Sequence, residues 1–261
     1  MNTETKDRVV AVIAAAALSA VLLDWTGAAE PVEAPLVSEY APAPVLIEQL
    51  RLFQEEFEEI VTDPQEYDSK ATRITRNAHT MAVLALALSL HDQQHELKHA
   101  APAILKAAQA AATTQQYDAA KEAVAEIRRA MADSNDNAAV APGSWHVVAP
   151  MGMLMKQVSF MHTRYNRGAR GSRFASRADQ YGRYAAVVAV IGQQIMTDTD
   201  EVELKDQADV DRWMQICADM RDHAGEVSAA YRAQDQAAAQ AALGRLEISC
   251  NSCHEVFRVE L

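Results

Sequence analysis

The residues with the clearest chemistry are two cysteines and a histidine near the C-terminal end of the sequence. Cys250, Cys253 and His254 form a C-x-x-C-H motif. On a helix, cysteines three positions apart lie on one face, so their thiols can add to the two vinyl groups of one haem. The adjacent imidazole can then reach the iron from the same side. The spacing therefore predicts one covalently attached haem c, with His254 as the proximal iron ligand.

Other uses of this motif have less support in the sequence. A zinc site would need a second pair of ligands at matching spacing, and the sequence has none. A redox-active C-x-x-C is expected in a βαβ setting, which the helical patterning does not provide. With 3 cysteines in 261 residues, a disulfide framework is not expected. Cys217 is interpreted as a buried core thiol.

The elements that must carry the motif are helices. Alanine is abundant, whereas only 9 glycines, 8 prolines and 6% aromatic residues occur, which favours long helices over a sandwich, a barrel or a doubly wound sheet. We therefore expect an all-α protein of two tandem up-down-up-down four-helix bundles, 45–141 and 142–261, divided at Pro142–Gly143. Apolar residues recur at helical spacing in eight segments: 45–61, 69–91, 102–113, 117–131, 150–166, 174–196, 208–233 and 234–257.

The second half of the chain repeats the helix order of the first. An offset of 119 residues places Lys106–Lys121 on Gly225–Gln240, although the matching residues are mostly alanine. At this offset Met131, Ser134 and Asn135 occupy the positions of the three motif residues. The first bundle is therefore expected to be haem-free, as a degenerate copy, a docking module or a dimerisation surface.

The last predicted helix continues a bundle core into the motif. Its apolar stripe comprises Ala239, Leu243, Leu246, Cys250, Cys253 and Phe257. An alanine-rich helix, a short link and a final helix that ends in C-x-x-C-H, followed by an aromatic and a basic residue, resemble the cytochrome c′ family over residues 208–258.

The resemblance implies roles for individual residues. Cys250 and Cys253 would hold the haem, His254 would be the proximal ligand, and Phe257 and Arg258 would lie at the haem-binding end. It also implies a periplasmic haem protein that binds a diatomic gas or carries single electrons, and bundles that pair as homodimers. The chain departs from the family in its greater length and in its first bundle, which lacks the haem motif.

The distal side of the haem is expected at the start of helix 150–166, because the first and last helices of such a bundle are antiparallel. Met151 and Met155 are four positions apart and share a face there. A thioether on the iron would give a six-coordinate haem of raised potential. Alternatively, these methionines pack beside a five-coordinate haem and admit small gases. His162 is two turns further along and is expected to be too far away.

The N-terminal segment is typical of an export signal. Lys6 and Arg8 precede an apolar run at positions 9–23, and small residues at 27–29 form a cleavage site. The proline-rich residues 30–44 are expected to be an extended linker. We therefore expect a periplasmic protein, with an uncleaved membrane anchor as the alternative.

These features define the expected function. The formal net charge of -12 argues against nucleic-acid binding. The leading hypothesis is a mono-haem c-type cytochrome that carries single electrons between periplasmic redox partner proteins. The alternatives are a five-coordinate haem protein that binds NO or CO, and a haem-containing adaptor in a larger complex. The sequence offers no candidate acid–base pair, so nothing in it points to an enzyme.

Two further signals are weaker. His91, His95 and His99 would line one face of an unbroken helix as a metal site, but the residues between them predict a polar loop. The basic run 164–173 is interpreted as a solvated loop, or as a receiver of an acidic partner or of the haem propionates.

Overall fold

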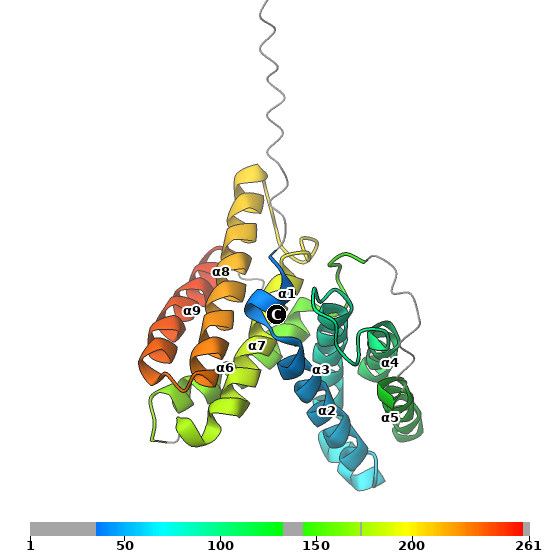
Figure 1. Ribbon diagram of the computed structural model, residues 1–261. Helices are drawn as coiled ribbons and strands as arrows, with labels where there is room; N and C mark the ends of the chain where they lie inside the picture. Colours follow the sequence, from blue (N-terminus) through cyan, green and yellow to red (C-terminus); the bar gives the residue numbers. More distant parts are fainter. Residues whose placement is uncertain (1–34, 133–142, 173, 258–261) are drawn as a thin grey trace, which may run out of the picture. The chain divides into compact units, whose positions relative to one another are not determined.

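A computed structural model describes residues 35–132, 143–172 and 174–257, and these residues belong to one compact unit. Within them the protein is all-α, as the sequence predicts, and no strand occurs. The helices, shown in Figure 1, are α1 (Val37–Tyr40), α2 (Ala43–Ile60), α3 (Pro64–Ser89), α4 (Ala101–Thr113), α5 (Tyr117–Ala132), α6 (Met151–Ala169), the 3₁₀ helix η1 (Ala175–Arg177), α7 (Ala178–Ile195), α8 (Gln207–Arg232) and α9 (Gln236–Phe257).

Two helix starts differ from the expectation, and proline explains both. Residues 37–44 are not an extended linker, because α1 lies there and Pro42 is the N-cap of α2. Helix α3 begins at Pro64, where Asp63 accepts a hydrogen bond from the Gln65 amide. Proline suits the first turn of a helix because the missing N–H would have no intrahelical acceptor. The Asp-Pro pair therefore starts α3 as well as ending α2.

The predicted signal peptide, residues 1–29, lies outside the described residues, as does the start of the predicted linker. None of the helices in the described ranges combines the length and the hydropathy needed to cross a membrane.

Helices α6–α9 form the C-terminal helix set, which contains the haem motif. Helix α8 joins α9 through a tight turn in which Gln234 has a φ of 56° and Asp235 caps the first turn of α9. Helix α6 is antiparallel to α9, because the Ala169 carbonyl accepts from Gln240 while Asn166, earlier in α6, contacts Glu247, later in α9. This set positions the candidate site.

Helices α2–α5 form the N-terminal helix set, and its last two helices repeat the last two of the C-terminal set. The links 114–116 and 233–235 are 119 positions apart. At the same offset each buried residue of α5 matches a buried residue of α9: Ala120 with Ala239, Ala123 with Ala242, Val124 with Leu243, and Ile127 with Leu246. Helix α9 has two further buried residues, Ser249 and Phe257. The helix order and the burial therefore agree with the weak sequence repeat.

The two sets share one hydrophobic core within the described unit. Arg183 of α7 donates to Glu48 of α2 at 2.6 Å, and the Arg76 guanidinium of α3 lies 4.3 Å from the ring centroid of Phe160 in α6. Helix α1 approaches α8 so closely that a Cβ on Gly225 would lie 2.9 Å from the Tyr40 Cβ. The division into separate domains stays a prediction.

Candidate functional site

The C-x-x-C-H motif lies in the last turns of α9, at the edge of the core. Leu246 and Phe257 are buried, while Cys250 and Cys253 are half-buried and pack against the core. His254 is exposed. The thiols therefore continue the apolar stripe of α9, and the imidazole lies beside it.

Burial governs the protonation of both motif thiols. Burial, with smaller contributions from the neighbouring Cys253 and Glu247, raises the pKa of Cys250 to about 11. Burial also raises the pKa of Cys253. Both cysteines are free and protonated at neutral pH, which leaves two neutral thiols on one helix face for covalent attachment.

The two flanks of α9 contact different helices. On one flank Arg245 pairs with Glu226 of α8 at 2.5 Å, and the Ser249 hydroxyl lies 3.0 Å from His223 Nδ1 of α8. On the other flank Glu247 accepts from Asn166 of α6 at 2.6 Å. His254 follows Glu247 by seven residues, about two helical turns, so it lies on the flank that faces α6.

The antiparallel register sets which α6 residues lie level with His254. Counting equal steps from the Asn166–Glu247 contact places Ser159 at that level. At 1.5 Å per residue, Met155 lies about 6 Å away along the axis, His162 about 4.5 Å and Met151 about 12 Å. Met155 is therefore the nearer of the two predicted methionines. The expectation that His162 lies too far away is wrong, because along the axis it is nearer to the level of His254 than Met155 is.

Three polar atoms on the side of α6 that faces α9 have no hydrogen-bond partner among the described residues. They are His162 Nε2, the Tyr165 hydroxyl and Asn166 Oδ1, all of which are hidden from solvent. Burial raises the pKa of Tyr165, and Cys250 is the next largest cause, so the two side chains are neighbours. Burial lowers the pKa of His162 and keeps it neutral.

Buried polar atoms without partners are rare in proteins. Their position on the side of α6 that faces α9, with Tyr165 next to Cys250, fits a large group that has apolar faces and polar edge substituents, as haem has. Sequence reasoning missed Tyr165 and Asn166. The four-three-four spacing of Met155, Ser159, His162 and Asn166 is the signal that could have found this face.

The third cysteine lies near the motif but inside the core. Cys217 of α8 is 1% exposed, as expected for a core thiol, and burial raises its pKa. Cys253 is the second cause of that shift, so the two thiols are close.

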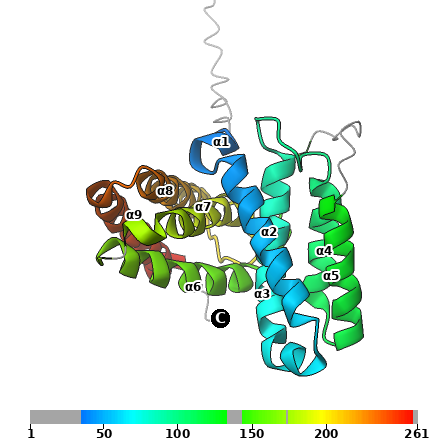
Figure 2. The same cartoon turned by 60° about the horizontal axis from the view of Figure 1, so that its bottom comes forward.

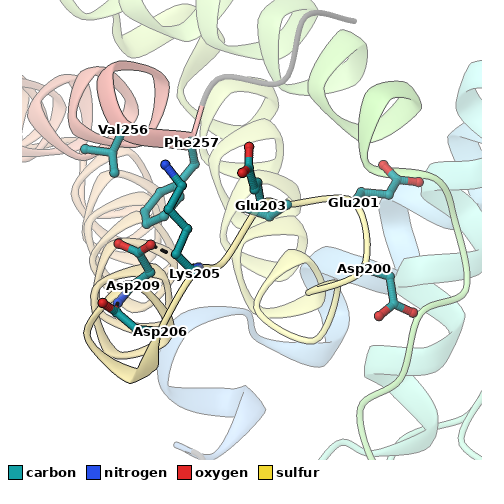
Figure 3. A pocket seen from close by; sticks show the side chains of 9 residues that line it. Asp200, Glu201, Glu203, Lys205, Asp206, Asp209, Val256 and Phe257 are labelled. Carbon is teal, nitrogen blue, oxygen red and sulfur yellow. Dashed lines mark hydrogen bonds between the residues drawn. The ribbon is translucent and has the colours of Figure 1, made fainter.

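An open pocket of about 680 Å³ borders the end of α9 (Figure 3). Val256 and Phe257 line it on the α9 side, and the Phe257 ring lies edge to face with Trp213, with centroids 5.5 Å apart. The remaining lining residues come from the loop before α8 and its first turn and are mostly acidic: Asp200, Glu201, Val202, Glu203, Lys205, Asp206 and Asp209. The motif therefore ends beside a negatively charged surface.

The remaining predicted residues are placed as follows. Arg258 lies outside the described residues, as does Arg173 of the basic run. Helix α3 ends at Ser89, so the three spaced histidines do not share an unbroken helix, which confirms the predicted loop. His91 Nε2 lies 3.2 Å from the Ala41 carbonyl, and His95 Nε2 lies 2.9 Å from the Leu88 carbonyl.

Among the described residues these features define a helical-bundle protein in which α9 presents the C-x-x-C-H motif to the antiparallel helix α6. The comparisons agree: residues 192–258 match the family model described as Cytochrome C'. This part of the chain, about a quarter of its length, is therefore related to the cytochrome c′ family, and the relationship indicates a haem-binding cytochrome. No curated protein and no solved structure matches the chain significantly.

Proposed function

We propose that the protein is an exported c-type cytochrome that carries single electrons between periplasmic partner proteins. One haem c would be bound covalently by Cys250 and Cys253, with His254 as its proximal ligand. The observation that carries this proposal is the direction of the motif: His254 lies on the flank of α9 that faces α6, where Met155 shares the opposing helix face. Haem supplies reversible one-electron chemistry when bound.

Each residue of the site has a distinct task in this proposal. The two thiols fix the group to the end of α9, and the buried Leu246 and Phe257 exclude water from its apolar faces. Met155 would be the sixth ligand, and a thioether in that position raises the reduction potential. Met151, which is buried one turn nearer the start of α6, would pack nearby and would not coordinate the iron.

Two substitutions on α6 test the proposed coordination. Met155→Ala should convert a low-spin spectrum into one that shifts on addition of carbon monoxide, and it should lower the reduction potential because the thioether is lost. Met153→Ala is the matched control, since Met153 is also half-buried but lies on the face of α6 turned toward α3.

Either of two results would contradict this part of the proposal. Unchanged spectra in Met155→Ala would remove Met155 as a ligand. A wild-type protein that already binds carbon monoxide would support the gas-binding alternative instead.

Export has its own test, because it rests on the sequence of residues 1–29 alone. We expect the protein expressed with its own N-terminus to be recovered in the periplasmic fraction, with a mature N-terminus close to Glu30. Recovery in the membrane fraction with residue 1 intact would instead indicate an uncleaved anchor.

A further inference from the structure

A second open pocket lies between the two helix sets, and we call it the α3–α6 groove. Its volume is about 560 Å³, which is within the range of small-molecule sites. Figure 2 shows the N-terminal part of α6 approaching α3, where the groove lies. Its lining residues are Ser69, Lys70, Thr72, Arg73, Thr75, Arg76, Met153 and Lys156.

The groove is basic in an acidic protein. Four of its lining residues are cationic and none is acidic, whereas the chain as a whole carries a formal net charge of -12. Lys70 pairs with Glu66 at 2.5 Å, and Arg73 pairs with Glu56 at 3.0 Å. Arg76 and Lys156 have no carboxylate within 4.0 Å among the described residues. The positive charge of the groove is therefore only partly compensated.

Arg76 is held in place by its neighbours. Its guanidinium lies over the Phe160 ring and donates to Asn77 Oδ1 at 3.3 Å, while Arg164 lies over the same ring at 3.4 Å. Burial lowers the pKa of Arg76; Glu56 opposes this change, whereas Arg73 and Arg164 add to it. An anion in the groove would thus meet a charged group that is already oriented and lies among other cations.

The spacing of these groups sets the size of the ligand. Ser69, Arg73 and Arg76 recur at helical spacing on one face of α3, which spans about 10 Å from first to last. Lys156 lines the groove from α6. One tetrahedral ion is too small to contact both ends of this row. Arginine forks bind phosphate and carboxylate groups in a bidentate manner.

We propose that the α3–α6 groove binds a small ligand with at least two anionic groups, of the phosphate or carboxylate class. The proposal does not depend on haem, since its residues lie on α3 and on the part of α6 that lines the groove with α3. In this proposal α3 of the N-terminal helix set and α6 of the C-terminal helix set bind the ligand together.

Isothermal titration calorimetry of the purified protein tests the proposal, with pyrophosphate, citrate and sulfate as probes. Sodium chloride keeps the ionic strength constant. Pyrophosphate or citrate should bind more tightly than sulfate. Arg73→Gln combined with Lys156→Gln should weaken that binding about tenfold or more, because the charge-assisted hydrogen bonds of two partly exposed cations are lost.

The matched control is Arg51→Gln combined with Lys106→Gln, which makes the same charge change at exposed positions on α2 and α4. Circular dichroism checks that both double variants fold. Binding of pyrophosphate alone would assign the ligand to phosphate compounds, and binding of citrate alone to polycarboxylates. No heat beyond that of chloride, sulfate binding as tight as pyrophosphate, or an equal loss in the control pair would overturn the proposal.

Discussion

Helices α5 and α9 occupy corresponding positions in the two helix sets, yet only α9 carries a haem motif. At the offset of 119 residues each buried residue of α5 matches a buried residue of α9, so residues 120–127 and 239–246 pack by the same pattern of small and aliphatic side chains. The two helices differ after these matching positions, because Met131 of α5 corresponds to Cys250 of α9. The C-x-x-C-H motif thus lies beyond the part of the helical hairpin that the two sets have in common.

We expect the largest effect from removing the two cysteines that distinguish α9 from α5. Cys250→Ser combined with Cys253→Ser should abolish covalent haem, because no thioether bond can form. Intact-protein mass spectrometry and the pyridine haemochrome spectrum measure the loss. Cys217→Ser is the control, since Cys217 lies outside the motif, and it should keep the haem. Haem that remains attached to the double variant would contradict the assignment.

A second comparison uses the corresponding core residues Ile127 and Leu246, both of which are fully buried. Ile127→Ala and Leu246→Ala should each lower the free energy of unfolding by about 2–5 kcal/mol, measured in urea. Only Leu246→Ala should also change the haem spectrum, because Leu246 precedes Cys250 by one turn of α9. Equal spectral changes in both variants would show that the two helix sets do not differ in this way.

We expect the smallest effects at Asp92 and Asp198, two loop carboxyls whose contributions to the free energy of unfolding change with pH in opposite directions. For Asp92, burial raises the pKa, but hydrogen bonds from Ser38 outweigh it and hold the pKa below its ordinary value of 3.8. Its contribution to stability is therefore present above pH 3.8 and is lost as the pH falls through the lowered pKa. Burial raises the pKa of Asp198, so its stabilising effect is present at low pH and is lost as the pH rises through the raised pKa.

Urea unfolding at about pH 2 and at pH 7 separates these two carboxyls. Asp92→Asn should destabilise the protein more at pH 7 than at the acidic pH. Asp198→Asn should destabilise the protein less at pH 7 than at the acidic pH, because the wild-type carboxylate is then buried and charged. The same sign for both variants would contradict the structural assignment of their surroundings.

Much of the fold follows from local sequence signals. The helical spacing of apolar residues predicts all the long helices, and most of their ends lie within a few residues of the observed ones. The N-terminal region was mispredicted because proline both ends extended segments and begins helices. Pro42 and Pro44 lie at the start of α2, and α1 precedes them. These two helices therefore replace most of the described part of the expected linker.

The candidate site was predicted less completely than the fold. The motif itself is local, so Cys250, Cys253 and His254 could be identified from spacing alone. The opposing face of α6 depends on the register between two helices 81 residues apart at the Asn166–Glu247 contact, which no local pattern encodes. That register favours Met155 over Met151 and brings His162, Tyr165 and Asn166 into the site.

In the proposed function the end of α9 carries a covalent haem whose iron has a ligand from α6. The decisive experiment is an optical spectrum of the exported protein, recorded oxidised and then reduced with dithionite, with and without carbon monoxide. A ligand from α6 predicts sharp low-spin bands of a c-type haem that do not change on addition of the gas. Broad high-spin bands that shift with carbon monoxide would contradict the ligand from α6, and the absence of haem absorbance would contradict the haem site itself.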